Sequence, residues 1–249
     1  MKASKAKRPQ IKVSAIIDAR GRMPDGALIA GLRLGNEHLL DRQLRLLQGE
    51  VDEYCVLGGE ELSLAADWAA KGVHRVAGIS GMSGLADALA ETRGRVVLLF
   101  SAAQAFPEVG ECRRVLASLR KRPVAGVFQG GRMSLARAQG ATVLSSTPSE
   151  DYWTAQLPLG FERALLGEVL SAAVHTKGAD RMNLCELTLR LGHAIALVEG
   201  RRSGFLIRDA FERKVATTGW KIIDDGNPMI AQSPLIAGIR QQVALDLTL

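Results

Sequence analysis

The side chains with the clearest chemical potential lie in a short basic loop, DARGRM at positions 18–23, which directly follows an apolar run near the start of the chain. Two arginines on either side of a glycine can bind an anion through their guanidinium groups and the backbone N–H groups. The same pattern is that of a strand-to-helix turn with ordinary surface arginines, and the sequence leaves both interpretations open. Asp18, next to Arg20, would repel a phosphate.

The remaining reactive side chains do not form a catalytic or metal-binding pattern. The histidines lie in unrelated segments, and the cysteines are far apart without a CxxC pair (His38, His74, His175 and His193; Cys55, Cys112 and Cys185). Hydrolase triads, a metal site and a disulfide framework are therefore not predicted. Because free thiols are typical of a reducing compartment, we expect a cytoplasmic protein.

The net charge gives little support for a nucleic-acid partner. The formal charge is +6, but four basic residues lie within the first ten positions, and without them the charge falls to +2. A further basic run (Arg113, Arg114 and 120–122) falls on a predicted helix without interleaved aromatic residues for base stacking. A solvated helix face is the better interpretation. No apolar stretch reaches the roughly 20 residues that a bilayer requires, so no membrane association is expected either.

Length and hydrophobic pattern predict one α/β domain. The chain has 249 residues with 47% hydrophobic content, enough to bury a full core. Strands are predicted at 12–17, 53–57, 95–100, 123–128, 193–198 and 205–207, and helices at 39–47, 62–70, 84–91, 112–119 and 161–174. This alternation predicts a Rossmann-like sandwich with a mostly parallel sheet covered on both faces. In such sheets ligands bind beyond the carboxyl ends of the strands, which is where the 18–23 loop falls.

The pattern also divides the chain into segments. Residues 1–10 should form a basic flexible tail, and residues 11–217 the domain itself. Within it, the glycine- and serine-rich stretch 129–150 predicts a protruding β-arm. Residues 218–249 form a C-terminal extension with apolar runs and few charges, which should dock on the body of the chain or on a protein partner.

Several segments of the chain resemble the methylerythritol phosphate cytidylyltransferase family. They read AII at 15–17, DYWTAQLPLGF at 151–161, LGH at 191–193 and LVEG at 197–200. The resemblance implies a nucleotidyltransferase sandwich that forms a homodimer, in which a β-arm, here 129–150, completes the neighbour's site. It also implies transfer of CMP from CTP to a sugar-alcohol phosphate with magnesium.

Bringing a triphosphate and a second phosphate together requires dense positive charge, which the family supplies with lysines, arginines and a metal held by aspartate. In the family, a glycine-rich loop after the first strand carries two cations that hold the triphosphate. The resemblance makes Gly21 and Arg22 the expected nucleotide contacts, with Arg20 as a substitute cation. Ile29 stands where the family's second cation belongs.

Most of the other matching positions have lost their charge. Ser83 keeps a serine that the family uses in recognising the base, although it would also serve as the N-cap of a helix at 85. Ser80 replaces an arginine. After the third predicted strand, Ser101 stands in place of an aspartate that helps to bind magnesium, and Gln104 in place of an arginine. A neutral hydroxyl is a poor magnesium ligand without a neighbouring carboxylate.

Asp180 is the exception, because it agrees with an aspartate of the family. An aspartate at a helix N-terminus is nonetheless a common stabiliser in any fold. Ser149 stands about where an arginine for the substrate phosphate belongs, and Leu206 where a lysine belongs.

Two functions remain open at this point. Losing one preorganised charge typically costs about 10²- to 10³-fold in rate, so a binding or regulatory protein without cytidylyltransferase activity is the first expectation. The alternative is an active nucleotidyltransferase whose cations have moved and which needs CTP and Mg²⁺. Further candidates for its cations are Arg33, Arg75, Arg132, Arg137 and Arg201 with Arg202.

Overall fold

The structure is a computed structural model, and it describes residues 12–62, 66–77, 81–139, 142–176, 179, 182–200 and 205–224. For residues 66–67, 131–139, 142–152 and 221–224 only the backbone is described. The expected basic tail at 1–10 lies outside these ranges, and so do Ser80, Asp180, Arg201 and Arg202.

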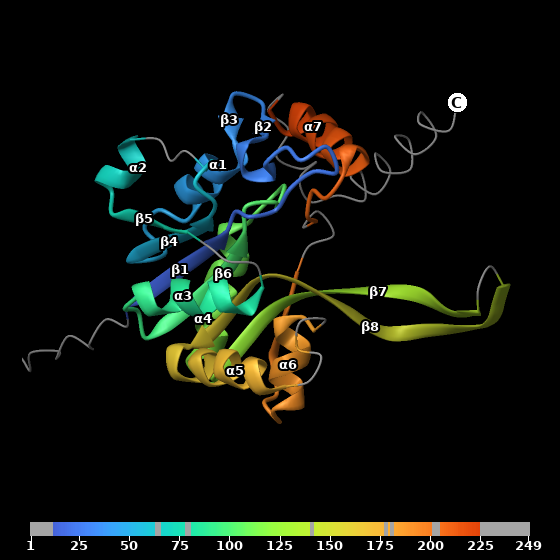
Figure 1. Cartoon of the computed structure of the whole chain (residues 1–249). Helices are drawn as coiled ribbons and strands as arrows, with labels where there is room; N and C mark the ends of the chain where they lie inside the picture. Colours follow the sequence, from blue (N-terminus) through green and yellow to red (C-terminus); the bar gives the residue numbers. More distant parts are fainter. Residues whose placement is uncertain are drawn as a thin grey trace, which may run out of the picture.

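A seven-stranded sheet in the order β5-β4-β1-β6-β8-β7-β9 forms the centre of the molecule (Figure 1). Its strands are β1 (Val13–Asp18), β4 (Glu53–Gly58), β5 (Val73–Ala77), β6 (Val96–Ser101), β7 (Val124–Gln139), β8 (Thr142–Glu162) and β9 (Ala196–Glu199). Only β8 runs antiparallel to its neighbours, between β6 and β7. The predicted mostly parallel sheet is therefore confirmed.

Helices cover both faces of the sheet, as the alternating pattern predicts. On one face α1 (Leu39–Leu46), α2 (Ala66–Ala70) and α4 (Val109–Leu119) pack against a cluster that includes Ile17. On the other face α3 (Met82–Glu91), α5 (Arg163–His175) and α6 (Leu184–Arg190) pack against a cluster that includes Ile16. Ile16 and Ile17 are both fully buried, which is why β1 is a continuous apolar run.

The strands β7 and β8 continue far beyond the body as a two-stranded antiparallel arm (Figure 1). Their pairing extends from Gln129↔Thr154 to Gln139↔Thr142. Irregularities in the register, including one between Gly131 and Met133, are of the kind that increases the twist of a two-stranded ribbon. The predicted β-arm is present.

A third apolar cluster lies beyond the carboxyl edge of the sheet. It joins the short helix η1 (Ile29–Gly31), the hairpin of β2 (Arg33–Leu34) and β3 (Glu37–His38), the turn after β6, and α7 (Ala210–Asp224). Helix α7 continues through residue 217, so the expected C-terminal extension starts within a helix. Residues 225–249 lie outside the described residues.

Some elements differ from the predicted ones. β5, the β2–β3 hairpin, α6 and α7 are not among the predicted elements, and 205–207 contributes only an isolated bridge between Leu206 and Gln104. β5 lies at the sheet edge, and Val73 is its one buried residue, so the apolar pattern of its sequence is weak. No helix in the described ranges is long and apolar enough to cross a membrane.

Candidate functional site

The site lies at the carboxyl ends of β1, β4, β5 and β6. Because β1 is paired in parallel with β4 on one side and β6 on the other, Asp18 at its end is the register partner of both Leu57 and Ser101. The backbone N–H of Ala19 donates to the Leu57 carbonyl at 2.8 Å, and that of Ala102 to the Asp18 carbonyl at 2.8 Å. The loops that follow the central strands are thereby held close together.

Arg20 is bound to Asp18. Its Nε donates to one carboxylate oxygen at 2.9 Å and a terminal nitrogen donates to the other at 2.7 Å. The Arg20 backbone N–H adds a third bond to the carboxylate at 3.1 Å, and the guanidinium also donates to the Gly81 carbonyl at 3.1 Å. Such a two-pronged arginine–carboxylate pair fixes both side chains, so Asp18 neutralises Arg20 instead of only lying near it.

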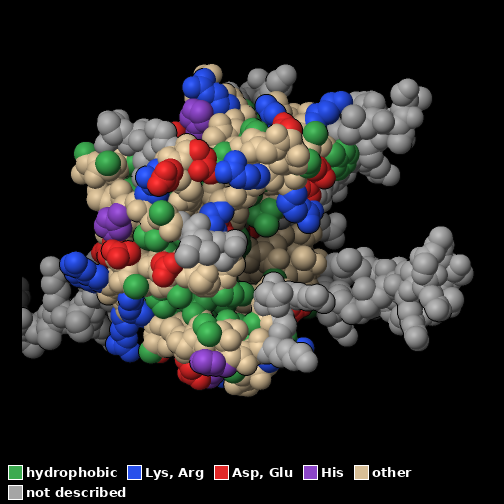
Figure 2. Space-filling model, viewed as in Figure 1, with side chains coloured by type: hydrophobic (Ala, Val, Ile, Leu, Met, Phe, Trp, Pro, Cys, Tyr) green, Lys and Arg blue, Asp and Glu red, His purple; other side chains and the backbone are tan. Residues whose placement is uncertain are grey.

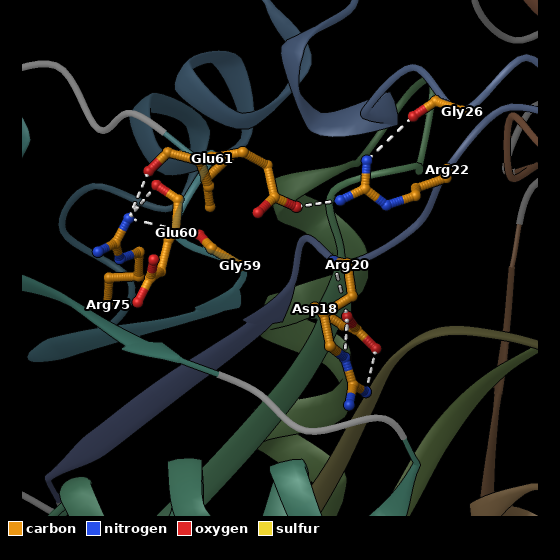
Figure 3. A network of polar contacts seen from close by, with 9 residues as sticks. Asp18, Arg20, Arg22, Gly26, Gly59, Glu60, Glu61 and Arg75 are labelled. Carbon is orange, nitrogen blue, oxygen red and sulfur yellow. Dashed lines mark hydrogen bonds and ion pairs between the residues drawn. The ribbon is translucent and has the colours of Figure 1, made fainter.

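Arg22 is also paired, but with a residue from another loop. One terminal nitrogen contacts the carboxylate of Glu61, which follows β4, and the other donates to the Gly26 carbonyl at 3.0 Å (Figure 3). The carbonyl of Gly21 accepts a bond from the Ile29 backbone N–H at 2.9 Å, which closes the loop onto the third apolar cluster. Each of the two candidate arginines therefore has a carboxylate partner.

The loop that carries Glu61 is held by Arg75 on β5. One terminal nitrogen of Arg75 donates to the carbonyls of Glu60 at 3.0 Å and Leu62 at 2.9 Å, with a longer bond to Gly59 at 3.4 Å (Figure 3). Arg75 is thus engaged with backbone, and Arg33 donates to a ring nitrogen of His38 at 3.3 Å. The side chains of Arg132 and Arg137 lie outside the described part of the structure.

The polar side chains at the end of β6 make hydrogen bonds within the protein itself. The Ser101 hydroxyl accepts a hydrogen bond from the Ala103 backbone N–H at 3.2 Å, within its own turn. Gln104 is only 4% exposed, and its amide nitrogen donates to the Leu157 carbonyl at 3.0 Å. Its amide oxygen is buried and has no hydrogen-bond partner. Neither side chain is a charged group facing a ligand.

Two other positions where the family has cations are apolar. Ile29 is 4% exposed and belongs to the third apolar cluster, so it is a core residue. Leu206 is 36% exposed. The bonds that fix its segment are those of the neighbouring backbone, between Ala105 N–H and the Phe205 carbonyl at 3.1 Å and between Ile207 N–H and the Ala103 carbonyl at 2.8 Å.

Ser83 is not an N-cap, which corrects that interpretation. Helix α3 already begins at Met82, and its N-cap is Gly81, whose φ of 79° is suited to glycine. Ser83 is exposed and lies in the first turn of the helix, near the carboxyl edge of the sheet. The helix therefore begins two residues earlier than the sequence pattern suggests.

The described side chains do not fit a magnesium ion. They contain no group of three or more His, Cys, Asp or Glu that could hold a metal. Asp18 is committed to Arg20, and its neighbour Ser101 is a neutral hydroxyl. Magnesium gives up water reluctantly and is held through carboxylates, which these side chains do not offer it.

Charges of both signs are interspersed on the surface seen in Figure 2, where Lys and Arg lie beside Asp and Glu. Such a surface lacks the continuous basic stripe of a nucleic-acid-binding face.

Glu61 was missed by reasoning from sequence, because nothing in a single chain indicates which acid from a distant loop meets Arg22. The sequence indicates Asp18 as a charge that would repel phosphate, and its pairing with Arg20 could have been inferred from their spacing.

Comparison with known proteins identifies the relatives of the chain. No family model matches it. It is 33% identical over 220 residues to the bifunctional enzyme IspD/IspF of Anaeromyxobacter sp. (strain Fw109-5), covering 79% of this chain and 54% of that protein. The bifunctional enzyme IspD/IspF of Anaeromyxobacter dehalogenans (strain 2CP-C) is 30% identical over 188 residues, covering 71% and 48%. The chain spans about half the length of these curated relatives.

The fold is that of a solved enzyme. The crystal structure of 2-C-methyl-D-erythritol 4-phosphate cytidylyltransferase from Thermus thermophilus superimposes with a TM-score of 0.74 at 24% identity, covering 85% of this chain and 100% of that one. This agreement confirms the predicted nucleotidyltransferase fold. Taken together, the sequence similarity and the shared fold show that this chain belongs to the methylerythritol phosphate cytidylyltransferase family.

Proposed function

We propose that this chain is a divergent member of the family that does not transfer cytidylyl groups and acts as a binding or regulatory protein. The observation that carries the proposal is the end of β6. There the expected aspartate and arginine are replaced by Ser101 and Gln104, and both side chains bond to the protein itself. The position that should face a metal and a triphosphate is used for packing.

Electrostatics supports the same conclusion. A reaction between CTP and a second phosphate needs several cations that are free to meet the developing negative charge. Arg20 and Arg22 each face a carboxylate, and Ile29 is buried in the core. Each missing preorganised charge costs about 10²- to 10³-fold in rate, and losses in one cluster combine without simple additivity. Little of the family's catalysis should remain.

The arm is the surface that we propose for self-association. We propose a homodimer through the arm at 129–150, as the resemblance implies, in the cytoplasm. The two long strands of the arm expose their edges far from the body (Figure 1), and such edges are usually covered in a stable protein. A protein partner bound through 218–249 is a further part of the proposal, because apolar chain ends tend to dock.

One observation favours the alternative of an active nucleotidyltransferase. Asp18 and two arginines still lie at the carboxyl end of the central strand, where the ligands of such sheets bind. If Arg132, Arg137 or the pair at 201–202 supplied the remaining charge, CTP and Mg²⁺ could be used. This alternative requires Asp18 to leave Arg20 and meet the metal.

Calorimetric titration of the full chain with CTP in the presence of Mg²⁺, with ATP as the control, measures nucleotide binding, and a pyrophosphate-release assay separates the two functions. The proposed function predicts no pyrophosphate release from CTP with methylerythritol phosphate, whether or not CTP binds. Release above the protein-free rate, lost on substitution of Arg22 by glutamine, would establish the alternative. Selective CTP binding without release would identify the nucleotide as a ligand and not as a substrate.

A further inference from the structure

The Glu61 carboxylate binds the guanidinium of Arg22, the arginine that the resemblance matches to the family's triphosphate loop. It reaches Arg22 from the loop after β4, 39 positions away in sequence, and the contact links the two loops (Figure 3). We propose that Glu61 is a built-in competitor for anionic ligands at Arg22, so that the affinity of this loop for phosphate groups is set by whether Glu61 is in place.

The two ion pairs of the site differ in how easily a ligand can displace them. Asp18 and Arg20 are two residues apart, share three hydrogen bonds, and have side chains only 37% and 19% exposed. Glu61 and Arg22 are 46% and 50% exposed and belong to separate loops. Exposed pairs of this kind contribute little to stability, so an anion with more charge than a carboxylate can replace Glu61.

A second arginine holds Glu61 in its place. Arg75 binds the backbone carbonyls on both sides of Glu61, at Glu60 and Leu62, and so fixes the loop without touching the Glu61 carboxylate. Arg22 is fixed in turn by its bond to the Gly26 carbonyl. Because the backbone around Glu61 and the side chain of Arg22 are both held, the Glu61 side chain can leave Arg22 by rotation alone. Arg75 is therefore a positioning residue for the competitor.

The chemistry of the displaced group defines the ligand class. A carboxylate presents two oxygens to a guanidinium in the same geometry as a phosphate does. The exposed Arg22, with the backbone of the glycine loop beside it, would thus receive a phosphate-bearing ligand. The inference rests on the proposed function in one respect, that the loop after β1 is where an anionic ligand meets the chain.

The test uses inorganic tripolyphosphate as the probe, titrated calorimetrically into the full chain and its Glu61→Gln variant at low salt. The variant is expected to bind about three- to fivefold more tightly, in keeping with the strength of exposed ion pairs. Higher salt should reduce this gain because exposed charges are screened. Glu60→Gln is the matched control. It removes the same charge from the adjacent exposed residue, and its affinity should stay close to that of the unmodified chain.

Two further variants complete the test. Adding Arg22→Gln to Glu61→Gln should abolish the gain, and Arg75→Met should produce part of it by releasing the loop. Equal effects of Glu61→Gln and Glu60→Gln, a gain that survives without Arg22, or no binding by any variant would overturn the proposal. These readouts do not depend on turnover, whereas the proposed function fails only if the unmodified chain releases pyrophosphate.

Discussion

Replacing Trp220 should loosen helix α7 from the body. The Trp220 ring lies over the Arg42 guanidinium at 3.9 Å from its carbon to the ring centroid, and Phe106 lies on the same cation at 5.8 Å. Arg42 is only 9% exposed, and burial lowers its pKa to about 10. On the outer side the indole packs against Gly35, whose φ of 63° marks the tight turn between β2 and β3.

The size of the effect follows from these contacts. Truncation of a fully buried tryptophan to alanine costs about 3–5 kcal/mol, and Trp220 is partly buried, so about 2–3 kcal/mol is expected for Trp220→Ala. Part of this is the cation–π contact, which is worth about 2 kcal/mol for a desolvated cation. A loss of about 2–3 kcal/mol in local stability raises the equilibrium population of the open helix roughly 30- to 140-fold, and amide exchange accelerates by the same factor.

Native-state amide hydrogen exchange, followed by mass spectrometry of the peptide that contains α7, measures this opening directly. A double-mutant cycle with Arg42→Met should give a coupling of about 1–2 kcal/mol. Trp220→Phe, which keeps a ring over the guanidinium, serves as the control and should lose less than half as much. A coupling within about 0.3 kcal/mol of zero, or unchanged exchange in Trp220→Ala, would refute the claim that the contact between Trp220 and Arg42 holds α7 on the body.

Four further outcomes are expected. Burial raises the pKa of Glu53, but bonds from the Ser14 hydroxyl and two backbone N–H groups outweigh it and hold the pKa below its ordinary value of 4.5. The stability from this carboxylate is present above that value and lost as pH falls through the folded-state pKa, so urea unfolding between pH 3 and 6 should be flatter for Glu53→Gln. Gly160→Ala should cost about 1–3 kcal/mol in urea unfolding, since its Cβ would lie 2.7–2.9 Å from three core side chains. Gly167→Ala, whose Cβ would meet one atom at 3.9 Å within α5, should instead stabilise by about 0.5–1 kcal/mol. Ser101→Asp should leave pyrophosphate release at the protein-free rate, because Arg20 still holds Asp18; a measurable rate would contradict that reasoning.

Much of the architecture could be predicted because its signals are local. The apolar runs of β1, β4 and β6 are strands buried on both faces, and alternation with helical spacing predicts a parallel sheet. β5 and α6 were not predicted, because an edge strand with one fully buried residue and a helix of seven residues carry weak periodicity. α7 was missed because its position depends on the surface that it covers.

The candidate site divides in the same way. The losses at Ser101, Gln104 and Leu206 are visible in the sequence, because the identity of a residue at a recognisable motif position determines which charge it can carry. Their present roles are not visible. That Gln104 is buried against a carbonyl and Ile29 belongs to the core depends on side chains brought from other strands and loops.

By itself, the sequence determines that this chain has the family's sheet, arm and basic loop. It also determines that most of the other matching positions carry no charge. Only the tertiary structure decides that the second loop arginine, Arg22, also faces a carboxylate. For Arg20 the partner is two residues away, whereas for Arg22 it is Glu61, on a different loop. The physical reason is that burial and helix or strand preference act over a few residues, while an ion pair between loops depends on the order of strands in the sheet.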